Sequence, residues 1–472
     1  MRFLEIVWIL SKYTLFYKLG QNRKKNLGQR LKLAFEELGL TFIKIGQVLS
    51  MRYDLLPRKD CEALHELLDN VNPIPFEEIV KIVEKEYGKP WREVFAVVYS
   101  QPLGSASVSQ VHKAELFDGT KVAVKVKRPD VAIKFISDIN ILKRLARIVS
   151  FFSPTLRHFQ IKELVIYFEN WLKQDIDFIL EVRNMEKIGN QYEFGRDNVR
   201  PHLGRVFFTK TFNNLCTENI IVMDFIDGIP MNRKEQILSN PNYNAYKRLK
   251  TYLNAAIRNW FRDDVDIYSF QADPHLSNIL ALPNGDVANV DCGLIAELSK
   301  KEADICRELI IAVYTKDVDK TLEIATEMTG VSYEEYVSIL RPDLEKYLKQ
   351  SENEGLGFWF MEFIKIMIKH RIKFPLFLTT FGRANLVMDG LVTTYMPEQT
   401  TLEIVGQELR RQAIKEMFRN IANADWLKVA FIASKKIQKT PDLIARFIED
   451  PIDFISKIVG AAKGPYGSRN YN

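Results

Sequence analysis

Residues 272–293 read ADPHLSNILALPNGDVANVDCG and contain the residues that decide the fold. Asp273 is followed five positions later by Asn278, and Asp291 comes after two short apolar runs separated by an Asn-Gly turn. Phosphoryl-transfer sites use one carboxylate to orient a nucleophile, and an amide oxygen with a second carboxylate to hold Mg²⁺. Because Asp and Asn are also common turn formers, this pattern alone leaves an ordinary loop as the alternative.

A second signal lies upstream, where Val122-Ala123-Val124-Lys125 places a lysine inside an apolar, β-rich run. A lysine is rarely buried without a partner, so a lysine on the inner face of this strand needs an anion, and ATP phosphates supply one. The alternative is a lysine on the outer face. The order of strand lysine, helical acid (Glu181), D-x-x-x-x-N and D-x-G matches the layout of protein kinases, which favours the inner face.

The rest of the chain predicts an α+β protein with two lobes. Residues 29–70 and the stretch that ends at Gly88 have helical patterns, and three β-rich runs follow. The second and third runs are joined by Asp118-Gly119, a strong hairpin signal. Helix is expected again to about residue 194, and from Asn244 onward after two more strand candidates. The expected parts are a basic amphipathic segment (1–28), a helical extension (29–90), a kinase-like N-lobe with a helical insert (91–228), a kinase-like C-lobe (229–400) and C-terminal amphipathic helices (401–472).

Over roughly residues 25–400 these motifs resemble the UbiB, or AarF-domain (ADCK-like), family of atypical protein-kinase-like proteins. Lys44-Ile45-Gly46-Gln47 is similar to the family's K-x-G-Q signature in an N-terminal extension. The run Pro102–His112 resembles the Ala-rich loop that replaces the kinase glycine loop, although Gly104-Ser105 departs from the alanine run. Glycine can approach a phosphate closely and sample positive φ, so this departure predicts altered nucleotide handling unless Gly104 only forms the turn between strands.

The resemblance implies a role for each motif residue. Glu181 would pair with Lys125 and hold its ammonium at the α- and β-phosphates of ATP. Asp175 and Asp177, which stand where the family has E-x-D, would contact Lys44 or metal, with a solvated helix face as the alternative. Asp273 corresponds to the catalytic-loop acid, and His275 is expected to be a structural histidine that shapes that loop, with contact to phosphate as the alternative. The implied ATP-binding residues are Gly104, Ser105, Ala106, Ser107, Lys125, Glu181 and the backbone of Met223 and Phe225; the implied Mg²⁺ ligands are Asn278 and Asp291; the residues implied for the extension are Lys44, Gln47, Asp175 and Asp177.

Composition excludes several other classes of protein. With 47% hydrophobic and 27% charged residues, the chain of 472 residues is typical of a folded protein. Its four cysteines are far apart, which argues against a disulfide scaffold and a cysteine zinc site and indicates a reducing compartment. An aromatic-basic RNA motif and zinc-finger spacing are lacking, so no nucleic-acid partner is expected. No apolar run reaches the roughly 18 residues of a membrane span.

The basic charge is concentrated at the N-terminus. Residues 1–32 hold eight Lys/Arg and one acid, so they carry +7 while the other 440 residues sum to −1. The first 20 residues, MRFLEIVWILSKYTLFYKLG, also contain many apolar and aromatic side chains. This combination predicts a helix lying on anionic lipid, and hence peripheral attachment on the cytoplasmic, reducing side of a membrane. A helix docked on the protein's own core is the alternative.

The resemblance implies an enzyme that uses ATP and Mg²⁺: a membrane-lipid-stimulated ATPase or a small-molecule phosphotransferase that supports isoprenoid quinone synthesis of the ubiquinone type. Isoprenoid or quinone-pathway components are then the expected partners. In the family the K-x-G-Q extension covers the cleft where a protein substrate would lie, which argues against ordinary protein kinase activity. Two alternatives are a non-catalytic, nucleotide-gated scaffold that binds lipid or quinone, and a true protein or metabolite kinase. The sequence leaves the oligomeric state and the substrate open.

Overall fold

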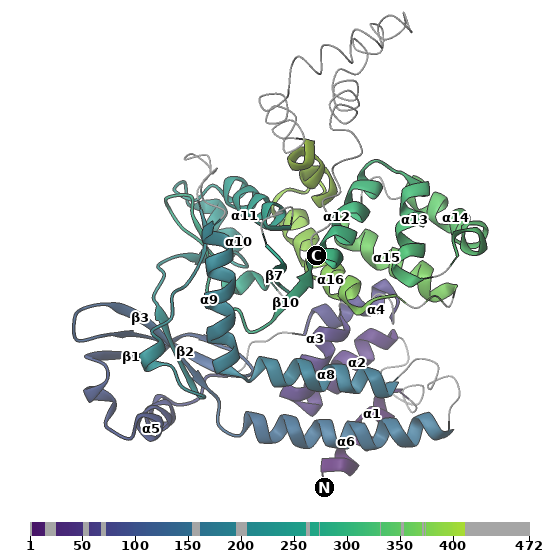
Figure 1. The fold of residues 1–472 in the computed structure, drawn as a ribbon. Helices are drawn as coiled ribbons and strands as arrows, with labels where there is room; N and C mark the ends of the chain where they lie inside the picture. The colour runs from purple at the N-terminus through teal and green to yellow at the C-terminus, as the bar shows by residue number, and fades with distance from the viewer. Residues whose placement is uncertain are drawn as a thin grey trace, which may run out of the picture. The chain divides into compact units, whose positions relative to one another are not determined.

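The structure is a computed structural model of the whole chain, drawn in Figure 1. It divides into two compact units, residues 1–402 and 403–472, and every feature discussed below lies in the first. The residues that the structure describes are 2–14, 25–50, 56–67, 72–152, 161–194, 205–260, 265–272, 274–330, 332–350, 354–370, 372 and 374–410.

The N-terminal extension is helical. Its helices are α1 (Arg2–Thr14), α2 (Leu27–Leu38), α3 (Leu40–Leu49) and α4 (Arg58–His65). A capping box formed by Asn26 and Gln29 starts α2. Gly39 ends α2 with a φ of +90°, a conformation that favours glycine, and α3 begins at the next residue. The helical pattern predicted over residues 29–70 is therefore divided among α2, α3 and α4.

Gly46 of the K-x-G-Q motif is required by packing. It lies within α3, where an added Cβ would come within 2.2 Å of Leu67 Cδ1 and 2.6 Å of Phe35 Cδ2. Carbon atoms in contact normally lie about 3.5–4.0 Å apart, so any side chain here would push α3 away from both neighbours. The glycine of the motif thus serves the close packing of the extension.

The N-lobe sheet is antiparallel and has the strand order β1-β2-β3-β5. Its strands are β1 (Val97–Ser105), β2 (Ser109–Glu115), β3 (Lys121–Lys127) and β5 (Ile220–Asp224). The three antiparallel strands predicted from the sequence, with a turn at Asp118-Gly119, are confirmed. Since side chains alternate along a strand, Val122, Val124 and Val126 share one face of β3 and Lys125 lies on the other.

Helices cover both faces of this sheet. They are α5 (Phe76–Tyr87) and α9 (Phe178–Phe194), whereas α6 (Val131–Phe152) and α8 (Ile161–Asp175) form the helical insert. On one face, Ile79 and Val83 of α5 belong to the same buried cluster as the three valines of β3. On the other face, Ala123 shares a cluster with Val182 and Met185 of α9. Figure 1 shows α6 and α8 running side by side, away from the sheet.

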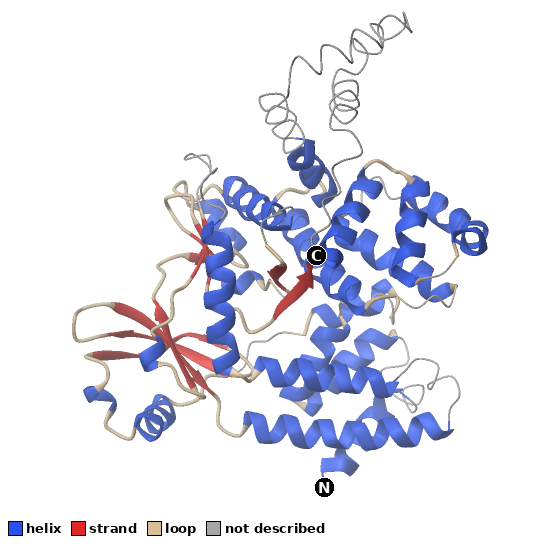
Figure 2. Cartoon of the chain, viewed as in Figure 1, coloured by secondary structure: helices blue, strands red, loops and turns tan. Residues whose placement is uncertain are grey.

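The C-lobe contains two small sheets and mostly helix, as Figure 2 shows. One sheet has the order β4-β9-β8-β6 and the other pairs β7 with β10. Its elements are β4 (Val206–Phe208), β6 (Ile229–Pro230), α10 (Lys234–Ser239), α11 (Ala245–Trp260), β7 (Ile267–Gln271), β8 (Ile279–Ala281), β9 (Val287–Asn289), β10 (Ile295–Ser299), α12 (Lys300–Tyr314), α13 (Val318–Thr329), α14 (Tyr333–Gln350), α15 (Leu356–Lys369) and α16 (Leu376–Tyr395).

Two details of this lobe differ from the sequence prediction. The strand predicted at residues 205–212 is shorter than expected and consists of β4 alone. It pairs in parallel with β9 and so belongs to a C-lobe sheet, although the prediction assigned the stretch 91–228 to the N-lobe. The strands β7 and β10 were not predicted, because helix was expected from Asn244 onward apart from the hairpin after Asn278.

One buried core joins the extension to the N-lobe. Its members come from the extension, the helical insert and the site-facing side of the sheet, and include Phe35, Phe42, Leu64, Phe135, Phe168, Phe178, Ile221 and Cys292. Because the apolar surfaces of these parts are buried against one another, we expect the extension and the N-lobe to unfold together.

Some predictions fall on parts of the chain that cannot be described. Residues 411–472, which hold most of the expected C-terminal amphipathic helices, lie outside the described residues, as do residues 15–24 of the N-terminal segment. In the part of the chain that is described, no helix has both the length and the apolar character needed to cross a bilayer. All four cysteines are free.

Candidate functional site

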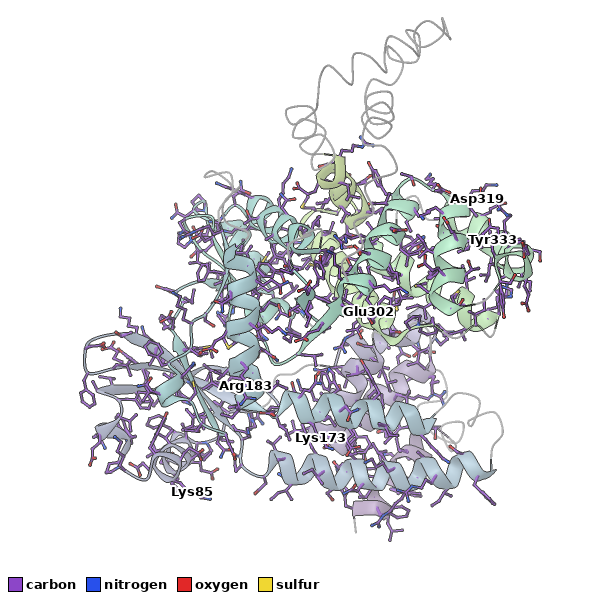
Figure 3. All side chains as sticks on the ribbon, in the orientation of Figure 1. Lys85, Lys173, Arg183, Glu302, Asp319 and Tyr333 are labelled. Atoms are coloured by element: carbon purple, nitrogen blue, oxygen red, sulfur yellow. The ribbon has the colours of Figure 1, made fainter. Side chains whose placement is uncertain are left out.

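The centre of the site is a lysine held between two carboxylates. Lys125 Nζ on β3 donates to Glu181 Oε1 at 2.6 Å and to Asp291 Oδ2 at 2.9 Å. The ion pair predicted between Lys125 and Glu181 is therefore present, and Asp291 joins it. Figure 3 labels Lys173 on α8 and Arg183 on α9, the two helices whose junction precedes Glu181.

The first turn of α9 fixes the position of Glu181. Asp177 Oδ1 accepts the Leu180 N–H at 2.9 Å, and the Asp177 carbonyl accepts the Glu181 N–H at 3.0 Å. Asp177 is thus an exposed N-terminal cap of the helix. The Phe178 ring, buried beneath the same turn, lies 5.4 Å from Lys125 Nζ and adds a cation–π contact.

Burial and the shared lysine set the charges of the three groups. Burial raises the pKa of Glu181 to about 7; attraction to Lys125 opposes this shift and repulsion from Asp291 adds to it. Burial also tends to raise the pKa of Asp291, but Lys125 and the Gly293 N–H outweigh it and the pKa is lowered. Burial tends to lower the pKa of Lys125, but the two carboxylates raise it. Near neutral pH, Lys125 and Asp291 are charged while Glu181 exchanges a proton.

The raised pKa of Glu181 predicts a pH-dependent stability. A carboxyl whose folded pKa exceeds its unfolded value of 4.5 contributes stability below that value and loses it as the pH rises through about 7. Between about pH 5 and about pH 8, wild type should therefore lose on the order of 2–3 kcal/mol relative to Glu181→Gln. Chemical denaturation of both proteins at the two pH values measures this difference. A difference that does not change with pH would contradict the assignment.

The β8–β9 hairpin brings Asn278 and Asp291 to the same end. Ile279 pairs with Asn289, and the next residue outward, Val290, donates its N–H to the Asn278 carbonyl at 3.0 Å. Asp291 is the next residue after Val290, and its carboxylate Oδ1 accepts the Gly293 N–H at 2.9 Å. Carboxylate and amide oxygens are the protein ligands that Mg²⁺ prefers. These two residues could hold a metal ion with the help of phosphate oxygens.

The loop before this hairpin is only partly described. Asp273, the predicted catalytic acid, lies outside the described residues. His275 Nδ1 lies 2.8 Å from Ser277 Oγ and also accepts the Ser277 N–H at 3.4 Å. These contacts are local, which agrees with the prediction that His275 shapes the loop.

The lysine of the K-x-G-Q motif reaches this site from the extension. Lys44 Nζ lies 3.6 Å from Asp175 Oδ2 and 5.5 Å from the centre of the Trp171 ring. Its charge also contributes to the lowered pKa of Asp291. Of the two acids expected near Lys44, Asp175 makes the contact. Gln47 Nε2 donates to the Leu67 carbonyl at 3.4 Å, which ties α3 to the end of α4.

The predicted nucleotide loop is the tip of the β1–β2 hairpin. Gly104 and Ser105 still belong to β1, opposite Val111 and Gln110, and Gly104 does not take a positive φ. Gly104 therefore neither uses the positive φ that glycine permits nor forms the turn itself, and its close approach to a phosphate stays a prediction. The tip itself is Ala106–Val108, closed by a 2.8 Å bond from the Ala106 N–H to the Ser109 carbonyl.

The expected adenine-binding segment uses some of its backbone groups internally. The Asp224 N–H donates to the Lys210 carbonyl at 2.9 Å, and the Phe225 N–H donates to the Lys121 carbonyl at 3.1 Å. Met223 pairs with Ala123 in the sheet and its side chain is buried. Any contact of adenine with the backbone of Met223–Phe225 would then have to use carbonyl groups rather than these two donors.

Comparison with known proteins places the chain in a family. Residues 66–325, more than half of the chain, match the ABC1 atypical kinase-like domain. The chain belongs to the ABC1 atypical kinase-like family. It is similar to an uncharacterized protein encoded in the 5′ region of hydrogenase 1 of Clostridium pasteurianum, with 30% identity over 95% of this chain and 82% of that protein.

Two further proteins are similar to this chain. The chain is 29% identical to the protein named "Probable protein kinase UbiB" of Sodalis glossinidius, over 67% of this chain and 56% of that protein. A solved Mycobacterium tuberculosis protein, described in complex with erythromycin, aligns with 75% of this chain and 91% of its own at 20% identity and a TM-score of 0.44. The resemblance to the UbiB family noted from the sequence is confirmed, and the fold is a two-lobed α+β kinase-like fold.

Several residues that support the site in this ABC1 protein were not predicted. Gln271 Nε2 donates to the Asp291 carbonyl at 2.9 Å, and Asn184 Nδ2 donates to the Cys292 carbonyl at 3.2 Å, so both hold the D-C-G turn. Arg383 of α16 is buried with its guanidinium 5.8 Å from the Trp171 ring. Their contacts are to backbone carbonyls or to a ring face, which leave no recognisable spacing in the sequence.

Proposed function

We propose that this ABC1-family chain binds ATP with Mg²⁺ between its lobes and transfers the terminal phosphoryl group to water or to a small molecule. The observation that carries the proposal is the buried Lys125 held by both Glu181 and Asp291. Because Glu181 is a second partner, the position of Lys125 does not depend on Asp291 alone. Glu181 would therefore keep Lys125 in place beside the phosphates if the Asp291 oxygen that now accepts from Lys125 turned to a metal ion instead.

The residues present fit a magnesium nucleotide. The Ser107 hydroxyl, at the tip of the predicted nucleotide loop, is fully buried and has no hydrogen-bond partner among the described residues, so a phosphate oxygen would satisfy it. The described residues contain no cluster of three or more His, Cys, Asp or Glu that could hold a metal. That suits Mg²⁺, which is usually bound through one or two protein carboxylates together with substrate phosphates.

The proposed roles of the protein groups follow from their positions. Asn278 and Asp291 would hold the metal, and Mg²⁺ when bound would neutralise charge on the phosphate oxygens. Lys125 would contact the phosphates, Glu181 would keep Lys125 in place, and the hairpin tip that carries Ser107 would cover them. Asp273 would orient the nucleophile, as in the kinase layout.

The substrate is proposed from the extension and from the family. Lys44 contacts Asp175 and its charge acts on Asp291, so the extension borders the site. In the family that the sequence resembles, this extension covers the cleft where a protein substrate would lie. This supports a small acceptor or water over a protein. The relative named UbiB supports a role in isoprenoid quinone synthesis of the ubiquinone type. Transfer of labelled phosphate to a defined protein would instead favour a true protein kinase.

Titration of ATP into the protein with and without Mg²⁺ tests the proposed binding. We expect saturable binding by one ATP per chain, at least about tenfold tighter with Mg²⁺ because the metal links the phosphates to Asn278 and Asp291. Absence of ATP binding under both conditions would contradict the proposal. Tight binding without any turnover would favour the nucleotide-gated scaffold, in which the same site controls lipid or quinone binding.

We also propose that the protein attaches peripherally to anionic membranes, on the reducing side, through α1. One face of α1 is docked, since Ile6 and Ile9 are buried and Arg2 bonds to Asp138 at 2.9 Å. On the other face, Leu4 and Trp8 are 70% and 64% exposed. The face with Ile6 and Ile9 therefore fits a helix docked on the protein's own core, and the face with Leu4 and Trp8 fits a helix lying on lipid.

Substitution of the exposed face of α1 tests this attachment. Leu4→Glu/Trp8→Glu should weaken binding to vesicles of anionic lipid by about tenfold or more, because two apolar side chains no longer enter the interface. Phe117→Glu, on an equally exposed aromatic residue of the β2–β3 turn, is the control and should bind as wild type does. Cosedimentation with vesicles measures the three proteins. Equal binding by all three would contradict the role of α1.

A further inference from the structure

A buried arginine ties the predicted nucleotide loop to the segment that leads in from the extension. Arg128 directly follows β3, the strand of Lys125, and is 9% exposed. Its Nε donates to the Ala106 carbonyl at 2.7 Å, and its Nη2 donates to Ser105 Oγ at 2.6 Å and to the Asn72 carbonyl at 2.8 Å. One guanidinium therefore ties the β1 side of the loop to the chain segment before α5.

The backbone of the same residue adds a further bond to the loop. The Arg128 N–H donates to the Val108 carbonyl at 2.8 Å. Val108 is buried in the core that the extension shares with the N-lobe. The loop tip at residues 106–108 is thus held by both the main chain and the side chain of Arg128.

Gln110 makes a second connection between the loop and this segment. Its Oε1 accepts the Ile74 N–H at 2.8 Å, and its Nε2 donates to the Ile74 carbonyl at 3.2 Å. The His112 ring fixes this orientation. Its Nδ1 lies 2.8 Å from the Tyr99 carbonyl and must donate there, so its Nε2, 2.9 Å from Gln110 Nε2, accepts. The side-chain amide of Gln110 consequently forms hydrogen bonds with both the N–H and the carbonyl of Ile74.

These contacts join the predicted nucleotide loop to the segment that connects the extension with the N-lobe. Residues 72–74 lie between α4, in the extension, and α5, which covers the N-lobe sheet. The loop at residues 105–108 is the one expected over the phosphates. Gln110 is 1% exposed and His112 is fully buried, so the hydrogen bond between their two side chains is shielded from water. Hydrogen bonds that are shielded from water hold their geometry more firmly than exposed ones.

We propose that Arg128 and Gln110 are positioning residues that fix the nucleotide loop to residues 72–74, so that the extension sets the place of the loop over the bound nucleotide. The proposal rests on the proposed function for its effect on nucleotide affinity. Neither residue is assigned contact with ATP. Arg128 acts through Ser105 and Ala106, and Gln110 acts through Ile74 and the start of β2.

The planar guanidinium is what allows one side chain to hold three acceptors. A lysine carries a similar charge, but its single ammonium cannot reach carbonyls on two separate segments in the same fixed geometry. Arg128→Lys should therefore preserve the charge and most of the packing while it loosens the loop. Gln110→Glu keeps the acceptor for the Ile74 N–H but loses the donors to the Ile74 carbonyl and to His112.

Arg248 offers a matched control in the C-lobe. It is 2% exposed, and its guanidinium donates to the backbone carbonyls of Leu282 and Pro283, the latter at 2.8 Å. Arg248→Lys thus removes the same kind of contact at the far end of the β8–β9 hairpin. Any general loss of stability should be similar in Arg128→Lys and Arg248→Lys, while an effect on the loop should be confined to the first.

Two measurements on the full chain test the proposal. Hydrogen exchange followed by mass spectrometry reports the peptide that spans residues 102–110, and titration reports the affinity for ATP with Mg²⁺. In Arg128→Lys and Gln110→Glu we expect exchange in this peptide to be faster by about tenfold, and the Kd for ATP to rise by about fivefold to tenfold. Arg248→Lys should change neither quantity.

Each outcome is decisive for one claim. Unchanged exchange at residues 102–110 in both variants would overturn the clamp. Faster exchange with an unchanged Kd would overturn its control of nucleotide affinity. If wild type itself binds no ATP, the proposed function fails, and the exchange measurement still decides whether the clamp exists.

Discussion

Asp291→Asn will abolish magnesium-dependent ATP turnover and leave the fold intact. The carboxylate is the charged oxygen ligand that we assign to Mg²⁺, whereas an asparagine oxygen carries no net charge. The amide can still accept the Gly293 N–H, the bond that Asp291 Oδ1 makes at 2.9 Å, so the turn should persist. Loss of several kcal/mol of transition-state stabilisation corresponds to a rate lower by about a thousandfold or more. Phosphate release from ATP at saturating Mg²⁺ measures this effect.

A second acid on the same hairpin provides the control. Asp286 is 5% exposed and is paired with Arg205, its Oδ2 lying 3.0 Å from Arg205 Nη2. Asp286→Asn should lower stability, because the Arg205 ion pair and its backbone bond are weakened, but should retain most of the turnover. If both variants keep wild-type turnover, Asp291 is not the metal ligand. If both lose it equally, the effect is one of hairpin stability.

Lys125→Met should have the largest combined effect on stability and ligand binding. It leaves the buried Glu181 carboxylate and the Asp291 carboxylate without their shared cation. Removal of one partner from a buried ion pair costs about 3–5 kcal/mol, and we expect the lower end because Glu181 can take up a proton. The loss should be greater at about pH 8 than at about pH 6, because protonation of Glu181 relieves the repulsion at lower pH. Chemical denaturation at both pH values measures it.

A double variant separates the structural role of Lys125 from its role in binding. Lys125→Met/Glu181→Gln removes the charge that the methionine leaves unpaired, so it should recover about half of the lost stability. It should not recover ATP affinity, since the cation for the phosphates is still missing. Recovery of both properties would mean that Lys125 serves the fold alone.

The sequence was sufficient to predict the centre of the site because residue type and strand alternation act locally. Lys125 had to lie opposite the three valines of β3, and on that face it meets the carboxylate of Glu181. The pairing with Glu181 followed from the kinase order of motifs. The order and antiparallel pairing of β1, β2 and β3 followed from short β-rich runs joined by tight turns.

Other features could not be predicted, because they depend on contacts between distant segments. The strands β7 and β10 form a two-stranded sheet whose paired residues are 24 to 32 positions apart in the sequence, and neither strand shows the regular apolar–polar alternation that identifies a strand. Arg128 and Gln110 bind backbone groups of residues 72–74, and a backbone carbonyl leaves no signature in residue type. The need for Gly46 also arises only when α3 meets Leu67.

The most direct test of the account is the release of phosphate from ATP by the purified wild-type protein, measured with and without Mg²⁺ and with and without vesicles of anionic lipid. The account predicts release that requires Mg²⁺, increases with anionic vesicles and is lost in Asp291→Asn and Lys125→Met. Release that proceeds without Mg²⁺, or that both variants retain, would contradict it, as would the absence of release under every condition.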